Sequence, residues 1–82
     1  MIRMGKESAT GPEEVIEKAV AFFGPQGVGL KVSDEGDCCA RFEGAGGYVY
    51  VESTARQGKK GSQITIEGRE WETQIRQFIG QL

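Results

Sequence analysis

The chain has 82 residues, enough for one small domain, and its 38% hydrophobic and 27% charged residues are typical of a folded globular protein. A net charge of −2 at pH 7 gives no general attraction to nucleic acid or to an anionic membrane surface. Histidine and asparagine are absent, which excludes histidine-dependent hydrolase triads, histidine metal sites and N-glycosylation.

Residues 1–9 carry no sustained hydrophobic period and are predicted to form a flexible tail, so that residues 10–82 make up a single α+β domain. No apolar run approaches the length of about 18 residues that a membrane span needs, and no signal-peptide core follows Met1. The expected location is therefore cytoplasmic, with no membrane partner.

A first helix is predicted directly after the tail. Thr10 and Glu13 have the spacing of a capping box, and Pro12 suits a first helical turn. Apolar residues then recur at helical spacing until Gly24 and Pro25 end the pattern; they are Val15, Ile16, Ala19, Val20 and Phe23.

Four strands are predicted next, because apolar and polar residues alternate in four segments: 28–33, 38–43, 48–52 and 63–67. Glycine-containing turns connect them in registers that keep one apolar face continuous; the expected opposed pairs are Val32 with Cys38, Phe42 with Val49 and Val51 with Ile66. The last pair assumes a turn at Gly58 and Lys59. A turn one residue earlier would set Val49 opposite Ile66 and would preserve the same apolar face.

A second helix is predicted from Arg69 onward, with Gly68 as its N-cap, because apolar residues return to helical spacing; these are Trp71, Ile75, Phe78, Ile79 and Leu82. The predicted fold is α+β: a helix, a four-stranded antiparallel meander and a helix (αββββα). Both helices are expected to pack on one face of the sheet, since each has a single apolar stripe to bury. The other face is left to solvent or to a partner.

This uncovered sheet face is the first candidate binding surface, and its expected residues are Arg41, Tyr48, Tyr50, Lys31, Glu52 and Thr65. Gly29 is expected beside Arg41, which leaves room for Arg41 to lie across Tyr50 and pair with Glu67. Acidic residues outnumber basic ones on this face, so nucleic acid is not an expected partner. A solvated face with cross-strand pairs and a protein interface are both compatible with the pattern.

The adjacent cysteines are expected on opposite sides of a strand, with Cys38 packed in the core and Cys39 an exposed thiol. A disulfide between them would distort the strand, and a metal site would need further Cys or His ligands. A redox role for Cys39 would depend on Lys31 or Arg41 favouring its thiolate. The acidic turn at 34–37 has too few ligands for calcium, so no metal site is expected.

A basic hairpin tip contains Arg56, Lys59 and Lys60. The sequence around it departs from a Walker A motif, since Lys60 stands where Ser or Thr is needed and no helix follows. The tip is expected to be a solvated turn, with docking of an anionic group as the alternative.

Aromatic residues of the two helices outline a further candidate, an apolar cleft between helices and sheet formed by Phe22, Phe23, Trp71 and Phe78. The sequence singles out no catalytic residues and no cofactor. The preferred function is a non-enzymatic protein-interaction module that uses the open sheet face and is homodimeric, because the core of so short a chain is marginal. The alternative is a domain that binds a small apolar ligand in the cleft.

Overall fold

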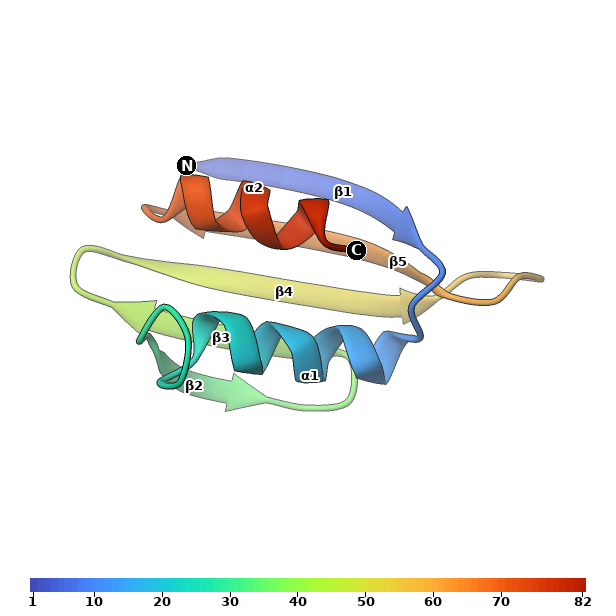
Figure 1. Ribbon diagram of the computed structural model, residues 1–82, viewed down its shortest axis with the longest axis horizontal. Coiled ribbons are helices and arrows are strands. Elements are labelled where there is room, and N and C mark those ends of the chain that lie inside the picture. Colours follow the sequence, from blue (N-terminus) through green and yellow to red (C-terminus); the bar gives the residue numbers. More distant parts are fainter.

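The computed structural model describes residues 1–82 and contains two helices and one five-stranded antiparallel sheet (Figure 1). Its elements in chain order are β1 (Ile2–Ser8), α1 (Pro12–Phe23), β2 (Lys31–Glu35), β3 (Cys39–Gly44), β4 (Gly47–Ala55), β5 (Ser62–Arg69) and α2 (Glu72–Gly80). The strands lie in the order β1-β5-β4-β3-β2, so β1 and β2 form the two edges. The α+β class is confirmed, whereas the predicted count of four strands is wrong.

The additional strand is β1, which occupies residues that the sequence analysis treats as a tail. It pairs antiparallel with β5 along its whole length, from Ile2 opposite Gly68 to Ser8 opposite Ser62. Its side chains alternate between half-buried and exposed up to the buried Ser8. The N-terminal segment is therefore an integral edge of the sheet.

Strand β1 could not be predicted from apolar alternation, because two of its inward-facing positions carry polar residues. Lys6 and Ser8 face the helices, where an apolar residue is the usual choice. The Lys6 ammonium donates to the Ile79 carbonyl at 3.0 Å, and the Ser8 hydroxyl donates to the Leu82 carbonyl at 3.3 Å. Both bonds tie β1 to the C-terminal end of the chain, where the Ile79 carbonyl also accepts from the Leu82 N–H at 3.2 Å. At these two positions of β1, hydrogen bonds to the C-terminal segment take the place of apolar contacts with the helices.

Helix α1 begins at Pro12 as expected, but the predicted capping box does not form. Gly11 is the N-cap, and no side chain caps the helix. The Thr10 backbone is instead fixed by β1 and β5, because its N–H donates to Ser8 Oγ at 3.1 Å and its carbonyl accepts from Ser62 Oγ at 2.7 Å. These bonds hold the turn between β1 and α1.

Helix α2 begins later than predicted, because β5 continues to Arg69 and Gly68 is a strand residue rather than an N-cap. A Cβ at Gly68 would lie 2.5 Å from Ile75 Cδ1, so glycine lets α2 approach the strand. Glu70 and Trp71 then turn the chain with left-handed φ values of 68° and 55°. Two non-glycine residues in this conformation give no pattern that periodicity can detect.

Two of the three predicted hairpin registers are confirmed, with Phe42 opposite Val49 and Val51 opposite Ile66. The register between β2 and β3 is wrong, since Val32 opposes Phe42 and not Cys38. The shift has two causes. The pairing of β2 is irregular between Val32 and Asp34, and Cys38 lies before β3 in the connecting loop.

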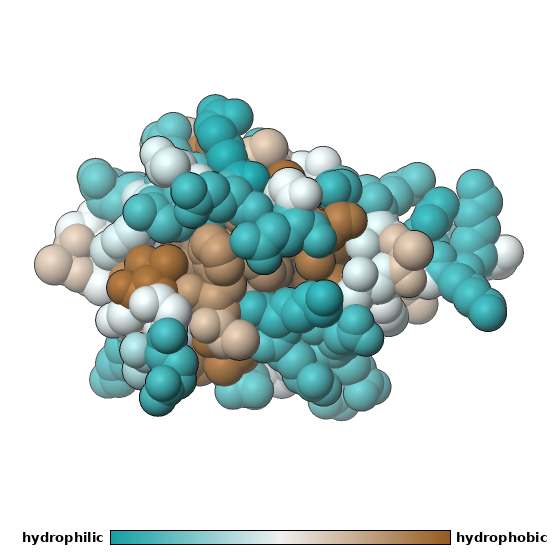
Figure 2. Space-filling view, in the orientation of Figure 1, coloured by the Kyte–Doolittle hydropathy of each residue, from teal (hydrophilic) through white to brown (hydrophobic).

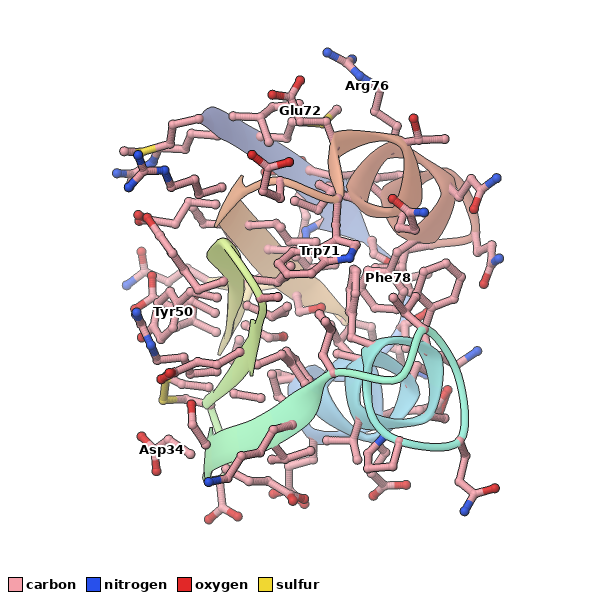
Figure 3. The ribbon with its side chains drawn as sticks, turned by 90° about the vertical axis from the view of Figure 1, so that its left-hand side faces the viewer. Asp34, Tyr50, Trp71, Glu72, Arg76 and Phe78 are labelled. Atoms are coloured by element: carbon pink, nitrogen blue, oxygen red, sulfur yellow. A yellow bond between two sulfur atoms is a disulfide. The ribbon has the colours of Figure 1, made fainter.

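The helices and the sheet form two layers. Helix α1 lies over β3 and β4 and α2 over β5, and both are on the same side of the sheet (Figures 1 and 3). Phe23 and Phe78 contribute the largest helix side chains to the core and are fully buried with Phe42 of β3. Their ring centroids lie 5.3 to 5.5 Å apart around Phe23, in contact geometry for aromatic pairs. This cluster binds the two layers together.

Two buried serines provide a matched test of the core. Ser53 is 1% exposed and its Oγ has no hydrogen-bond partner, whereas Ser62 is 0% exposed and donates to the Thr10 carbonyl. Because an unpaired buried hydroxyl carries a desolvation cost, we expect Ser53→Ala to leave the free energy of unfolding unchanged or to raise it by up to about 1 kcal/mol. Ser62→Ala should lower it by about 1 kcal/mol. Urea denaturation distinguishes the two, and equal losses would contradict the assignment.

Candidate binding surface on the open sheet face

The sheet face away from the helices carries no second layer. In Figure 3, Tyr50 and Asp34 project from this side, whereas Trp71 and Phe78 lie on the helix side. We call this surface the open face. One cross-strand row on it runs from Arg41 through Tyr50 and Glu67 to Arg3, and the next places Tyr48 between Glu43 and Arg69.

A connected network of polar and aromatic groups lies at the centre of the open face. The Arg41 guanidinium lies 4.5 Å from the centre of the Tyr48 ring, and its Nε is 3.2 Å from Glu43 Oε2. The Tyr48 hydroxyl donates to Glu67 Oε2 at 2.9 Å. Arg41 is thus held by a ring face and a carboxylate at once.

The expected partners of Arg41 are wrong in two respects. Arg41 covers Tyr48 and not Tyr50, and it pairs with Glu43 of its own strand and not with Glu67. Gly29 precedes β2, and Asp34 occupies the position opposite Arg41. The irregular pairing of β2 is what brings Asp34, rather than Gly29, opposite Arg41.

The network shifts the pKa of two of its members. The pKa of the Tyr48 hydroxyl is raised, chiefly because its hydrogen bond to the Glu67 carboxylate stabilises the protonated form. The pKa of the Glu43 carboxyl is lowered first by the neighbouring Ser33 side chain and then by Arg41, whose Nε lies 3.2 Å from Glu43 Oε2 and stabilises the carboxylate.

Removing the acceptor of Tyr48 should reverse its shift. In Glu67→Ala we expect the Tyr48 pKa to fall toward the usual tyrosine value of about 10. Ultraviolet titration measures the Tyr48 pKa when Tyr50→Phe has removed the only other tyrosine, both with Glu67 and with Glu67→Ala. Because the pKa is higher in the folded state, this bond stabilises the fold below the unfolded tyrosine pKa and is lost as pH rises through the folded value. An unchanged pKa in Glu67→Ala would contradict the geometry.

The other predicted face residues lie around this network. Tyr50 is half-buried between Arg41 and Glu67, and Glu52 opposes Thr65 on the neighbouring strand. Lys31 lies on the β2 edge, opposite Glu43. The six residues therefore belong to one side of the sheet.

Sequence reasoning missed two cations of the open face. Arg3 of β1 lies 4.0 Å from Glu67, and Arg69 extends the same side of β5. The alternation of Thr65, Glu67 and Arg69 could have placed Arg69, but Arg3 required recognition of β1. With both arginines present, the face mixes charges of both signs.

The basic hairpin tip is not a cluster of three free cations. Arg56 Nη2 lies 3.4 Å from Glu7 Oε1, and its Nη1 donates to the Lys60 carbonyl at 3.4 Å. Lys59 and Lys60 are exposed at the end of the hairpin, which projects from the rest of the molecule (Figure 1). Arg56 is therefore engaged in holding the hairpin against β1.

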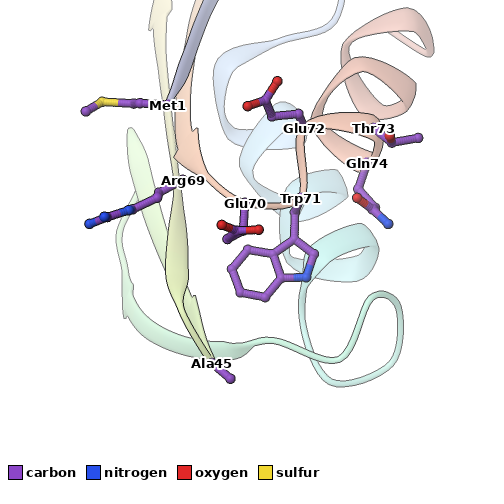
Figure 4. Close-up of a pocket in the computed structure, with 8 residues that line it drawn as sticks. All are labelled: Met1, Ala45, Arg69, Glu70, Trp71, Glu72, Thr73 and Gln74. Carbon is purple, nitrogen blue, oxygen red and sulfur yellow. The ribbon is translucent and has the colours of Figure 1, made fainter.

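The four residues of the predicted apolar cleft are divided between different surroundings. Phe23 and Phe78 are buried in the core, while Phe22 is half-buried with its ring 5.5 Å from that of Phe78. Phe22, Phe78 and Leu82 line a shallow groove of about 320 Å³, and apolar residues gather on this side of the molecule (Figure 2). Trp71 instead lines a separate hollow of about 560 Å³ at the start of α2 (Figure 4).

The cysteines differ from expectation. Cys38 is exposed rather than packed in the core, and its sulfur is bonded to that of Cys39, so neither is a free thiol. Cys38 lies before the regular part of β3, so the alternation that assigned it to the core does not apply there. Cys39 opposes Glu52 in the sheet.

No helix has both the length and the apolar character needed to cross a membrane. No three His, Cys, Asp or Glu side chains are grouped as metal ligands. Comparisons with protein-family models, with curated proteins and with solved structures find no match for this chain.

Proposed function

We propose that the protein is a non-enzymatic protein-interaction module that binds its partner through the open face. The observation that carries this proposal is the set of Arg41, Tyr48 and Tyr50, side by side and half-buried on a sheet face that no helix covers. Tyrosine and arginine are enriched at protein interfaces and among the residues that dominate binding energy.

The contacts within the face favour a protein over a single-stranded nucleic acid. A base-stacking platform needs a free aromatic face, but one face of the Tyr48 ring is covered by Arg41. The Arg41 charge is balanced by Glu43, and Glu67 lies beside the Tyr48 hydroxyl. A phosphate backbone gains little from such a surface, whereas a protein with complementary charges gains from both signs.

The network also lowers the conformational cost of binding. Arg41 and Tyr48 are each held by two partners before any contact is made. Binding therefore immobilises fewer free rotamers than it would on a face of unpaired long side chains.

A photo-crosslinking amino acid at Tyr50 tests the proposal in cells that express the protein. The matched control carries the same group at Glu17, which is exposed on α1 on the other side of the molecule. We expect a discrete protein adduct from position 50, lost on Arg41→Glu, and no equivalent adduct from position 17. Absence of an adduct from position 50, or the same adducts from both positions, would overturn the proposal.

The groove between the helices supports a second candidate, binding of a small apolar ligand. Phe22 is half-buried there beside Phe78, and the groove is lined mainly by apolar residues. Titration with octanoate, followed by amide chemical shifts, tests it. Saturable shifts at Phe22 and Leu82 that disappear in Phe22→Ser would support this function, and unchanged shifts would exclude octanoate-like ligands.

A further inference from the structure

The two edges of the sheet differ in how well they can pair with another strand. Strand β2 has five residues, its pairing shifts between Val32 and Asp34, and its exposed end carries Asp34 and Glu35. Short length and irregular pairing are features that protect edge strands from pairing. Charge does not separate the two edges, because each strand carries three charged residues. Strand β1 has seven residues in unbroken register with β5, and it contains no proline. The β1 edge is therefore the one available for another strand.

We propose that a second copy of this chain pairs with the β1 edge, forming a two-fold symmetric dimer with one continuous sheet. Directly opposed residues of antiparallel strands share a sheet face. In two copies of β1 related by a two-fold axis, full overlap of residues 2–8 places Gly5 on the axis. Arg3 then opposes Glu7 of the second copy, and Glu7 opposes its Arg3.

This register is favoured by charge. The side chain of Arg3 is 72% exposed and that of Glu7 is 62% exposed, so both are accessible for pairing. Within one chain Arg3 lies 4.0 Å from Glu67, and Glu7 lies 3.4 Å from Arg56. Across the axis these pairs join into a row of alternating charge, from Glu67 and Arg3 of one copy to Glu7 and Arg56 of the other.

The neighbouring registers lack this complementarity. With Met4 on the axis, Arg3 opposes Gly5 and Glu7 falls outside the partner's strand. With Lys6 on the axis, two ammonium groups oppose each other on the helix side, where each is already bonded to an Ile79 carbonyl. Like charges directly opposed destabilise a strand pair.

The surroundings of the edge are compatible with a second copy. Glu72 and Arg76 extend from α2 on the β1 side of the molecule (Figure 3), so this flank carries one charge of each sign. Met1, which is 82% exposed, precedes β1 and in the proposed register would oppose Ala9 of the second copy. The open faces of both copies become one surface, but the edge contact does not depend on their having a partner.

Sedimentation equilibrium of the full chain tests the dimer directly. We expect a wild-type mass of twice the 8.9 kDa of one chain, with the mass falling as salt screens the ion pairs. Arg3→Glu and Glu7→Arg should each halve this mass, because each puts like charges opposite one another. A monomeric wild type at high concentration would overturn the proposal without any variant.

Mixing the two variants separates pairing across the axis from effects within one chain. An equimolar mixture of Arg3→Glu and Glu7→Arg should recover the double mass, since every opposed pair in the heterodimer is again complementary. The internal pair that each substitution breaks, with Glu67 in Arg3→Glu and with Arg56 in Glu7→Arg, stays broken in the mixture, so restored internal pairs cannot produce the recovery. Failure to recover the dimer from folded variants would contradict the register.

A matched control addresses the other edge. Glu35→Arg reverses an exposed acid on β2 and should leave the dimer intact. Dissociation by Glu35→Arg would move the interface to the β2 edge and overturn the proposal. If circular dichroism shows that a β1 variant does not fold, the wild type alone tests the interface. On dilution of the wild type, we expect the amide chemical shifts of β1 to change and those of β2 to stay constant.

Discussion

Replacing Phe23 by alanine is expected to lower the free energy of unfolding by about 3–5 kcal/mol. Phe23 is fully buried, and its ring packs against those of Phe22, Phe42 and Phe78 with centroids 4.9 to 5.5 Å apart. The truncation removes the aromatic contacts that Phe23 makes with Phe42 of the sheet and with Phe78 of α2. A domain of this kind has a total stability of only about 0.05–0.15 kcal/mol per residue. We therefore expect a large fraction of the variant to be unfolded at room temperature.

Phe22→Ala is the matched control, because it makes the same chemical change at the adjacent position. Phe22 is half-buried at the rim of the cluster and leaves no enclosed cavity when truncated. Its cost should be less than half that of Phe23→Ala in urea denaturation followed by circular dichroism. Equal costs would show that the aromatic cluster is not packed as described.

Removing residues 1–8 is expected to abolish cooperative unfolding. The deletion removes one of the two partner strands of β5 and leaves Ile64 and Ile66, which are 0% exposed in the intact chain, on the edge of the sheet. It also leaves the Ile79 and Leu82 carbonyls without their side-chain donors. Fully burying an aliphatic side chain contributes about 1.5–3 kcal/mol, so these losses are comparable to the whole stability of a small domain. Thermal and urea transitions at fixed protein concentration measure the effect.

Point variants within β1 give a finer version of this test. Met4 is half-buried on the helix side, and its neighbour Arg3 is exposed on the open face. At a protein concentration low enough for the wild type to be monomeric, Met4→Ala should cost about 1–2 kcal/mol and Arg3→Ala less than about 0.5 kcal/mol. If the deletion has no effect and the two point variants have equal unfolding free energies, residues 1–9 form a flexible tail and the pairing of β1 with β5 is contradicted.

The central hairpin could be predicted from sequence because all of its determinants are local. Gly46 has a φ of 86°, which suits a tight turn, and the alternation on either side then sets Phe42 opposite Val49. The same reasoning placed the residues of the open face on one side of the sheet. The register does not predict which tyrosine ring Arg41 covers. Tyr50 is directly opposite Arg41, but Arg41 lies over the ring of its diagonal neighbour, Tyr48.

The predictions from sequence fail at residues whose role depends on a contact with a distant part of the chain. Lys6 and Ser8 interrupt the apolar alternation of β1 because they bond to carbonyls near the C-terminus. Gly68 resembles a helix N-cap but is needed for the close approach of Ile75. Local periodicity carries no information about either contact.

Cross-strand nuclear Overhauser effects between β1 and β5 test most directly whether the open face is bounded by a fifth strand. Both the open face with Arg3 and the proposed dimer edge depend on this pairing. The structure predicts contacts that place Met4 opposite Ile66 and Gly5 opposite Thr65, continuing to Ser8 opposite Ser62. Random-coil shifts for residues 1–8 with no contacts to β5 would contradict it.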